Sequence, residues 1–417
     1  MIKKNEETRT GTIESCQICK GRTLQPVIDL GYHPPCDSLL TETQLHEPEN
    51  FYPLNIVRCA DCGLVQLDYI VPPTIVFHKE YPYRTGITQI LVNNFKELAS
   101  LTTQFFEPSQ KNLVVDIGSN DGTSLLQFKT KGFRVLGVEP TNIALLALKN
   151  GVPTIQDFFS SKIARKIVKT HGHASVVVAS NVFAHINNIT SFMDGLSQLL
   201  SKDGLFISES QYLMDILEKL EYDTIYHEHL RFYSLKPLIG LFRKSGFSLV
   251  HAERITVAGG SVRVFAKKGN HPMSKATKQL LKIEEKKGLY KEAVYRDFRK
   301  RVAISRLRLV TLLNQLKLRG KHIVGISSPG RSSTILNYCH IDPVLIPYTA
   351  EQSNSLKLGL FTPGTHVPII DEKKLFKEQP DYAVLFSWHI AGTIIKKLRA
   401  KGLRSKFIIP LPSPKIL

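Results

Sequence analysis

One short stretch, an apolar run that enters a turn of small residues, limits the fold more than any other feature of the chain. Residues 113–117 read Leu-Val-Val-Asp-Ile, and the turn Gly-Ser-Asn-Asp-Gly follows at 118–122, ahead of a helical pattern. A buried strand that leads through a turn into a helix is the repeating unit of α/β folds. We therefore expect an α/β fold from residue 112 onward.

Further apolar segments alternate with helical patterns along the rest of the chain. The expected strands lie at 133–140, 175–186, 204–210 and 256–268, and then at 322–327, 343–351, 382–388 and 406–411. A helix is expected over 87–106, and basic helices over about 275–318 separate the two sets of strands. Alternation of strands and helices predicts two parallel sheets.

Four of the six cysteines form a second constraining pattern. Cys16 and Cys19 make one C-x-x-C pair, and Cys59 and Cys62 make another. A gap of two residues lets both thiolates of a pair reach one tetrahedral zinc ion, and the second pair completes the coordination. Because four cysteine ligands leave no position for water, we expect one structural zinc ion per chain. A redox pair, which would need a βαβ context that is missing here, and four ordinary thiols are the alternatives.

The turn after residue 117 is the best candidate for a cofactor site. Its glycines permit a sharp turn and a close approach of a ligand, and its D-x-G-x-N-x-G order differs from the G-x-G-x-x-G of dinucleotide-binding folds. Glu139 ends the next strand, 23 residues after Asp116, where a carboxylate can accept hydrogen bonds from a ribose diol. These features resemble motif I and the second-strand acid of class I S-adenosylmethionine methyltransferases. A nicotinamide cofactor and a generic strand–turn–helix unit are the alternatives.

The cofactor-binding candidates follow from this arrangement. They are Asp116, Gly118, Asn120, Asp121, Gly122, Glu139, Asn181 and Asp157, the last placed beside the adenine. All lie in or after expected strands of one sheet, where open α/β folds bind ligands.

The segment Tyr226-His227-Glu228-His229 is dense in reactive side chains. Imidazole titrates near neutrality, so it can remove a proton from a carbon that an adjacent carbonyl acidifies. A neighbouring carboxylate can fix its tautomer, and a phenol can donate to an enolate oxygen. His185 follows another expected strand and is a further candidate. A plain helix, with Tyr226 and His229 on one face and His227 in solvent, is the alternative.

In this order, these motifs resemble the nucleotide-sugar 3-C-methyltransferases of deoxysugar biosynthesis. The matching landmarks, besides the two cysteine pairs, are 80–84, 116–122, 181–185, 226–229, 259–263, 336–339 and 363–369. The resemblance covers nearly the whole chain. It implies an N-terminal zinc-binding domain, placed at 1–75, and a methyltransferase domain at 76–272 with a helical lead-in at 84–108. A C-terminal Rossmann-like domain with the basic helices then occupies 273–417.

The resemblance also implies a reaction. The substrate would be a nucleoside-diphosphate 4-keto-deoxysugar, usually dTDP-linked, whose C3 proton is acidified by the C4 ketone. His229 would remove that proton, and the enolate carbon would take the methyl group of S-adenosylmethionine to give a 3-C-methyl sugar. The groups expected to support the enolate are Tyr226, Glu228, His185 and Tyr81, with Tyr83 as the alternative to Tyr81. Arg263 and Ser261 are the candidates for binding the substrate.

The charge balance points to anionic partners without choosing among them. The net charge is +19, and residues 275–321 hold 15 Lys/Arg against 4 Asp/Glu. A zinc-containing RNA methyltransferase is therefore the main rival function, although we find no aromatic base-flipping tetrad and do not expect nucleic acid as a partner. A non-catalytic binding protein would be expected to lack Asp116, Glu139 or His229. With no apolar run near 20 residues and no secretory signal, we expect a cytoplasmic protein without a membrane segment.

The loop at 325–332 departs from the family pattern. It reads Gly-Ile-Ser-Ser-Pro-Gly-Arg-Ser and nearly matches a phosphate-binding P-loop, but Arg331 stands where such loops carry lysine. We therefore do not expect ATP hydrolysis. The stretch 348–359 also looks irregular for the family. Cys36 and Cys339, outside the two pairs, are expected to be buried as small apolar side chains.

Overall fold

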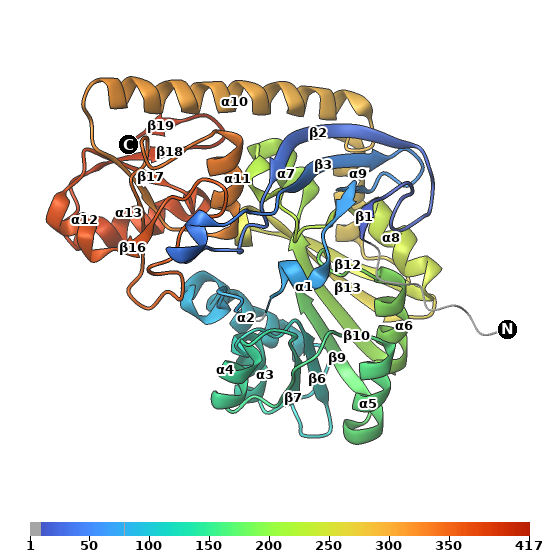
Figure 1. Ribbon diagram of the computed structural model, residues 1–417. Helices are drawn as coiled ribbons and strands as arrows, with labels where there is room; N and C mark the ends of the chain where they lie inside the picture. Colours follow the sequence, from blue (N-terminus) through green and yellow to red (C-terminus); the bar gives the residue numbers. More distant parts are fainter. Residues whose placement is uncertain (1–9, 79) are drawn as a thin grey trace.

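The central sheet of the molecule has the strand order of a methyltransferase core. The computed structural model describes residues 10–78 and 80–417, and its largest sheet has seven strands in the order β12-β13-β10-β9-β6-β7-β8 (Figure 1). The strands are β6 (Leu113–Ile117), β7 (Arg134–Val138), β8 (Thr154–Ile155), β9 (Ala174–Ser180), β10 (Leu200–Gln211), β12 (Phe247–Ile255) and β13 (Ser261–Lys268). Strands β6 to β10 run parallel, whereas β13 lies antiparallel to both β10 and β12.

One edge of this sheet differs from the sequence prediction. A single β segment was expected over 256–268, but a hairpin of β12 and β13 is found, so the sheet is mixed rather than all parallel. Strand β12 reads FSLVHAERI, with buried positions alternating with partly exposed or exposed ones over most of its length. An edge strand of that kind has the polar alternation of an antiparallel sheet and no continuous apolar run.

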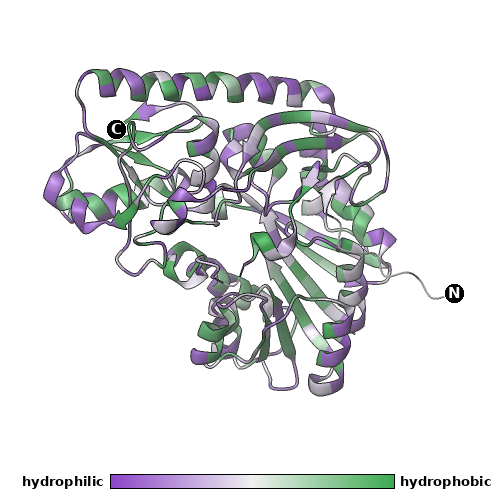
Figure 2. Ribbon diagram, in the orientation of Figure 1, coloured by the Kyte–Doolittle hydropathy of each residue, from purple (hydrophilic) through white to green (hydrophobic). Residues whose placement is uncertain are grey.

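Helices cover both faces of the central sheet because its strands are apolar on both sides. The helices are α2 (Gln89–Thr102), α3 (Thr123–Thr130), α4 (Ala144–Lys149), α5 (Ser161–His171), α6 (Ile189–Leu199), α7 (Leu213–Lys219) and α8 (Leu235–Lys244). Val114, Val176 and Val178 belong to one buried cluster with α2 and α3, and Val115 and Val177 face the opposite way, into the cluster that includes α5 and α6. Figure 2 shows the strands as mostly hydrophobic and the outer helix faces as hydrophilic.

The N-terminal part forms a small sheet to which the middle of the chain adds a strand. Its order is β11-β4-β3-β2, where β2 is Leu24–His33, β3 is Tyr52–Cys59, β4 is Val65–Leu67 and β11 is Arg231–Phe232. Strands β1 (Gly11–Thr12) and β5 (Tyr69–Ile70) pair separately, and the short helix α1 (Pro73–Val76) follows. Because β11 comes directly after residues 226–229, the N-terminal sheet supports that segment through backbone hydrogen bonds.

The C-terminal sheet has the order β16-β15-β14-β17-β18-β19. Its strands are β14 (Ile323–Ile326), β15 (Thr349–Glu351), β16 (Ile369–Asp371), β17 (Tyr382–Leu385), β18 (Lys406–Ile409) and β19 (Lys415–Ile416), and its helices are α11 (Gly330–Tyr338), α12 (Lys373–Glu378) and α13 (Ala391–Ala400). Only β19 is antiparallel to its neighbour. The strand expected over 343–351 is reduced to its last three residues, since prolines at 343 and 347 lack the amide hydrogens of a ladder.

The predicted basic helices are present as α9 (Lys275–Lys286) and α10 (Glu292–Leu318). Figure 1 shows α10 along the outside of the molecule, from the C-terminal sheet to the N-terminal one. Its arginines make internal contacts: Arg299 to the carbonyl of Pro26 (2.9 Å), Arg301 to the carbonyl of Leu217 (3.1 Å), and Arg306 over the ring of Tyr338. Part of the basic charge therefore fastens the three parts of the chain together.

No helix in the described part of the chain is both long and apolar enough to cross a bilayer.

Candidate active site

A large cavity opens at the carboxyl ends of the central strands. Its volume is about 1420 Å³. Residues from all three parts of the chain line it, including Asp37 and Tyr81, Gly118 and Glu139, Asn181 and His185, Tyr226, Glu228 and His229, and Arg331 and His389. The cavity thus brings the predicted cofactor turn and the Tyr-His-Glu-His segment into one space.

One half of the cavity is the predicted cofactor turn. Gly118 has φ +71°, and a side chain there would meet Val182 Cγ2 at 2.3 Å, so only glycine fits. The backbone amide of Asn120 donates to Glu139 Oε2 (3.0 Å), while the amide (3.0 Å) and hydroxyl (2.7 Å) of Thr141 donate to Oε1. These bonds hold the carboxylate of Glu139 in a fixed orientation at the cavity wall.

The donor and acceptor pattern of this half fits S-adenosylmethionine. Glu139 can accept hydrogen bonds from ribose hydroxyls, as the acid at this position does in nucleotide-binding folds. Ser180 Oγ and Gln211 Oε1, at the ends of β9 and β10, are buried and have no hydrogen-bond partner among the described residues, although both side chains line the cavity. Unpaired buried polar atoms at such a wall fit a polar ligand group.

The other half of the cavity holds an oriented histidine. Nδ1 of His229 lies 2.6 Å from the carbonyl oxygen of Thr224, and since a carbonyl only accepts, Nδ1 carries the proton. Burial lowers the pKa of His229 to about 4, so the ring is neutral at pH 7. Nε2 makes no hydrogen bond within the described residues and is left with its lone pair. The rings of Tyr226 and His185 lie 4.0 and 4.9 Å away, centroid to centroid.

A buried carboxyl group lies beside this histidine. The hydroxyl of Tyr81 donates to Glu228 Oε2 (3.0 Å), and the thiol of Cys36 donates to Oε1 (3.3 Å). Burial, and next the charge of Asp37, raise the pKa of Glu228 to about 8, so the group is largely protonated at pH 7. Asp37 in turn accepts from the buried ammonium of Lys357 (2.7 Å). The N-terminal and C-terminal parts of the chain therefore both contribute to the surroundings of Glu228.

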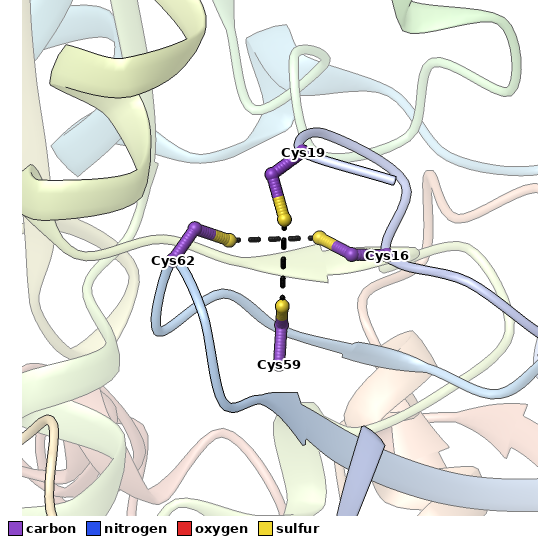
Figure 3. Close-up of side chains that lie close together, drawn as sticks. All are labelled: Cys16, Cys19, Cys59 and Cys62. Carbon is purple, nitrogen blue, oxygen red and sulfur yellow. Dashed lines mark hydrogen bonds between the residues drawn. The ribbon is translucent and has the colours of Figure 1, made fainter. Parts of the chain in front are cut away.

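The two cysteine pairs converge on one point. Sγ of Cys16 lies 3.5 Å from Sγ of Cys62, Cys19 and Cys59 are equally close, and all four sulfurs lie within 4.8 Å of one another (Figure 3). Tetrahedral coordination with zinc–sulfur distances of about 2.3 Å places sulfurs roughly 3.8 Å apart. The four side chains therefore fit a zinc ion with a closed set of ligands, and such a site is structural.

Comparisons with known proteins identify the family. Residues 16–77 match the family "Putative zinc binding domain", residues 91–252 match "Methyltransferase domain" and residues 256–412 match "C-methyltransferase C-terminal domain". The C-methyltransferase NovU of Streptomyces niveus is 31% identical over 411 residues, 97% of this chain and 97% of that protein. This chain belongs to the C-methyltransferases. The enzyme is a methyltransferase that uses S-adenosylmethionine, and its four clustered cysteines lie in the part of the chain that matches the zinc-binding family.

Three further matches each cover less than half of this chain. An uncharacterized methyltransferase of Alkaliphilus oremlandii (strain OhILAs) is 25% identical over 130 residues, which cover 29% of this chain and 58% of that protein. The solved structure of PH0226 from Pyrococcus horikoshii OT3 covers 48% of this chain and 96% of its own at 16% identity, with a TM-score of 0.36. The structure of magnesium protoporphyrin IX methyltransferase from Synechocystis PCC 6803, with bound SAH, covers 43% of this chain and 83% of its own. The sequence identity is 12% and the TM-score is 0.34.

Several predicted cofactor residues of the C-methyltransferase lie behind the cavity wall instead of on it. Asp116 is buried under the turn, where burial raises its pKa to about 8. Asp121 accepts from the amide of Gly86 (2.9 Å), and Gly122 has φ +80° at the start of α3, so both shape the turn. Asp157 is exposed and accepts from the amide next to it, although the following phenylalanine lines the cavity. Of the eight candidates, Gly118, Asn120, Glu139 and Asn181 line the cavity.

Arg263 and Ser261 lie away from the cavity, which corrects the expectation that they bind substrate. The guanidinium of Arg263 is fully buried and is paired with Glu209 (2.6 Å), Glu253 (2.8 Å) and Glu97 (3.1 Å). The hydroxyl of Ser261 donates to a carbonyl of the preceding turn (3.0 Å). A guanidinium that already has three carboxylate partners is not available to a diphosphate, so Arg263 holds the sheet against α2.

The Tyr-His-Glu-His segment is a turn and not a helix. As a result His227 points away from its neighbours: it is 1% exposed, and its Nε2 lies 3.2 Å from the carbonyl of Pro53 in β3. It can serve neither as a solvated side chain nor as a substitute base. Tyr81, and not Tyr83, makes the contact with Glu228, while Tyr83 is 39% exposed at the cavity lining.

Sequence reasoning missed the partners that come from the two outer parts of the chain. Asp37, Lys357 and His389 carry no motif that would have marked them. Cys36 was expected to be buried and is, but its contact with Glu228 was not foreseen. Arg331 had one signal, its position in the loop that resembles a P-loop, and it lines the cavity.

Proposed function

We propose that this enzyme transfers a methyl group to C3 of a nucleoside-diphosphate 4-keto-deoxysugar, with dTDP as the expected nucleotide, through an enolate. The observation that carries this proposal is that one cavity contains both the cofactor turn and the Tyr-His-Glu-His segment. Glu139 and Gly118 line the cofactor half, and a neutral His229 with an unbonded Nε2 lines the other. Methylation of carbon needs a carbanion-like nucleophile, so a base must lie within reach of the proton on that carbon.

His229 has the properties that this base needs. The C4 ketone acidifies the C3 proton, and Nε2 can accept that proton directly. The hydrogen bond from Nδ1 to the carbonyl of Thr224 keeps the ring in the correct tautomer and stabilises the imidazolium that forms. S-adenosylmethionine, when bound, supplies the electrophilic methyl group.

Tyr226 is suited to hold the enolate oxygen, and Tyr81 acts through Glu228. Burial raises the pKa values of Tyr81 and Tyr226 well above that of free tyrosine, so both phenols keep their protons. Glu228 fixes the hydroxyl of Tyr81 and is itself largely uncharged at pH 7. Neutral hydrogen-bond donors stabilise the negative charge that develops on the oxygen in the transition state more than they stabilise the uncharged ketone.

The size and charge of the cavity support a second large ligand beside the cofactor. A volume of about 1420 Å³ exceeds the roughly 300–1,000 Å³ that surrounds a single drug-sized ligand. Lys162 and Arg165, at the start of α5, line the cavity and offer positive charge to an anionic substrate. In this role they replace Arg263.

Proton exchange tests the proposal without relying on turnover. The enzyme is incubated in D2O with a dTDP-4-keto-6-deoxysugar, with and without S-adenosylmethionine, and deuterium at C3 is followed by NMR and mass spectrometry. We expect enzyme-dependent exchange in both cases and a methylated sugar only when S-adenosylmethionine is present. The control is the same sugar with the ketone reduced to a hydroxyl, which should neither exchange nor be methylated. Methylation of added RNA without sugar exchange would overturn the proposal in favour of the RNA methyltransferase.

A further inference from the structure

The carbonyl that orients His229 belongs to a short segment that the C-terminal domain holds. Residues 222–224 form one 3-10 turn, and His229 Nδ1 donates to the carbonyl of its last residue, Thr224. The hydroxyl of Thr334, in α11, donates to the carbonyl of the next residue, Ile225 (2.8 Å). The position of the base therefore depends on contacts made by α11.

Arg331, in the first turn of α11, makes the strongest of these contacts. Its Nη2 donates to Glu221 Oε2 (3.1 Å), and its Nε lies 3.4 Å from Asp223 Oδ2, so one guanidinium spans both acids on the segment. Its Nη1 bonds Nδ1 of His389 (2.6 Å), and its plane lies over the ring of Trp388. The indole of Trp388 also donates to Asp223 (2.7 Å).

We propose that Arg331 is a positioning residue for the base: it holds residues 221–225 so that the carbonyl of Thr224 meets Nδ1 of His229. This assigns a use to the arginine that replaces lysine in the P-loop-like stretch. The kinetic part of the proposal rests on the proposed function of His229, whereas the geometric part does not.

The charges around residue 331 explain why this position needs arginine, and they suggest a substitution that tests the proposal. Glu221 and Asp223 are 1% and 0% exposed, and each has one oxygen without a hydrogen-bond partner in the described residues. Removing the positive charge would leave two buried carboxylates uncompensated and would threaten folding. Arg331→Lys keeps the charge but loses the planar fork, because an ammonium cannot reach both acids and His389 in the same geometry.

The first measurement is the Nδ1 proton of His229 itself. Enzyme labelled with [15N]histidine is examined by NMR, and the signal that disappears in His229→Asn is assigned to His229. We expect a downfield, slowly exchanging Nδ1–H in the wild type, which is lost or exchanges rapidly in Arg331→Lys. Arg306→Lys is the matched control, because Arg306 stacks on Tyr338 at the other end of α11 and makes no hydrogen bond to 221–225. An unchanged Nδ1–H signal in Arg331→Lys would overturn the proposal.

The second measurement separates positioning from binding. Arg331→Lys should lower kcat for C3 exchange by about 10–100-fold with the Kd for S-adenosylmethionine unchanged, and Arg306→Lys should alter neither. If Arg331→Lys does not fold, Thr334→Val, which deletes only the bond to Ile225, should lower kcat about 3–10-fold with the same split. Equal losses in Arg331→Lys and Arg306→Lys would show a merely structural role. If the wild type shows no exchange, the proposed function fails, while the NMR result still decides the positioning role.

Discussion

The two halves of the cavity are built in opposite ways. In the cofactor half, Glu139 is held by Asn120 and Thr141, which lie 19 and 2 residues from it in the sequence. In the half that holds the base, Glu228 is held by Tyr81 and Cys36, which lie 147 and 192 residues away. The first half is built around a local structure, the strand–turn–helix–strand unit from 113 to 139, whereas the second exists only when three parts of the chain are assembled.

This difference predicts that the halves fail separately. Damage to the cofactor half should weaken binding of S-adenosylmethionine and leave the base in place. Damage to the other half should stop proton removal and leave cofactor binding intact. Substitutions far from the base, in any of the three parts of the chain, should be able to cause this damage.

The largest effect is expected for His229→Asn. Asparagine can keep a hydrogen bond to the carbonyl of Thr224 but cannot accept the C3 proton, so exchange should fall by about 10²–10⁴-fold, the usual contribution of a general base. Calorimetric binding of S-adenosylmethionine should stay within about twofold of the wild type. Undiminished exchange would move the base elsewhere, and His227 is not available, since it lies against Pro53.

Glu139→Ala should show the reverse pattern. Loss of the oriented carboxylate removes hydrogen bonds to the ribose, each worth about 1.5–3 kcal/mol when charged, so Kd for S-adenosylmethionine should rise about 10–100-fold. C3 exchange in the absence of S-adenosylmethionine should change by less than about threefold. Asp203→Ala, an exposed acid on β10, serves as the control. If exchange collapsed together with cofactor affinity in Glu139→Ala alone, the halves would not be independent.

The same contrast explains what the sequence could predict. The cofactor turn was found because its strand, glycines and acid stand within 27 residues, from 113 to 139, and each has a local physical reason. The choice of Tyr226, Glu228 and His229 came from their density in four residues and from a family resemblance. Their surroundings, above all Asp37 and Lys357, depend on the assembly of distant segments, and no local pattern encodes that.

Arg263 shows a second limit of prediction from the sequence. A basic residue on a strand near a ligand-binding edge is a reasonable candidate for a phosphate, but strand alternation decides which way its side chain points. Here it points toward α2, and it pairs with Glu97 of that helix as well as with Glu209 of β10 and Glu253 of β12. The presence of three acids around one arginine follows only from the packing.

The pH dependence of C3 exchange should reflect the burial of His229 and Glu228. With a pKa of about 4, His229 stays neutral as the pH falls from 8 to 5.5, so the rate should not drop near pH 6.5 as it would for an ordinary histidine. Above about pH 8, Glu228 loses its proton and places a negative charge beside the forming enolate, so the rate should fall. Glu228→Gln cannot ionise, so its exchange rate at pH 9 should equal its own plateau rate. Expressed as a fraction of each enzyme's plateau rate, the rate at pH 9 should be several-fold higher in Glu228→Gln than in the wild type. A parallel decline in both enzymes would contradict this assignment.

The smallest effect is expected where the zinc domain supports the base. Gln17 lies between the first two zinc ligands, and its side-chain amide donates to the carbonyl of Leu230 (3.3 Å), the residue after His229. The carbonyl of Leu230 also accepts from the amide of Leu67 (3.0 Å), so Gln17→Met removes one of the two hydrogen bonds to that carbonyl and should slow exchange only about 2–5-fold. Zinc content measured by mass spectrometry should remain about one per chain in Gln17→Met, whereas Cys59→Ser should lose the metal and unfold the N-terminal sheet. A loss of exchange in Gln17→Met as large as in His229→Asn would mean that the base half depends on a single contact with the zinc domain, and not on the combined hold of both outer domains.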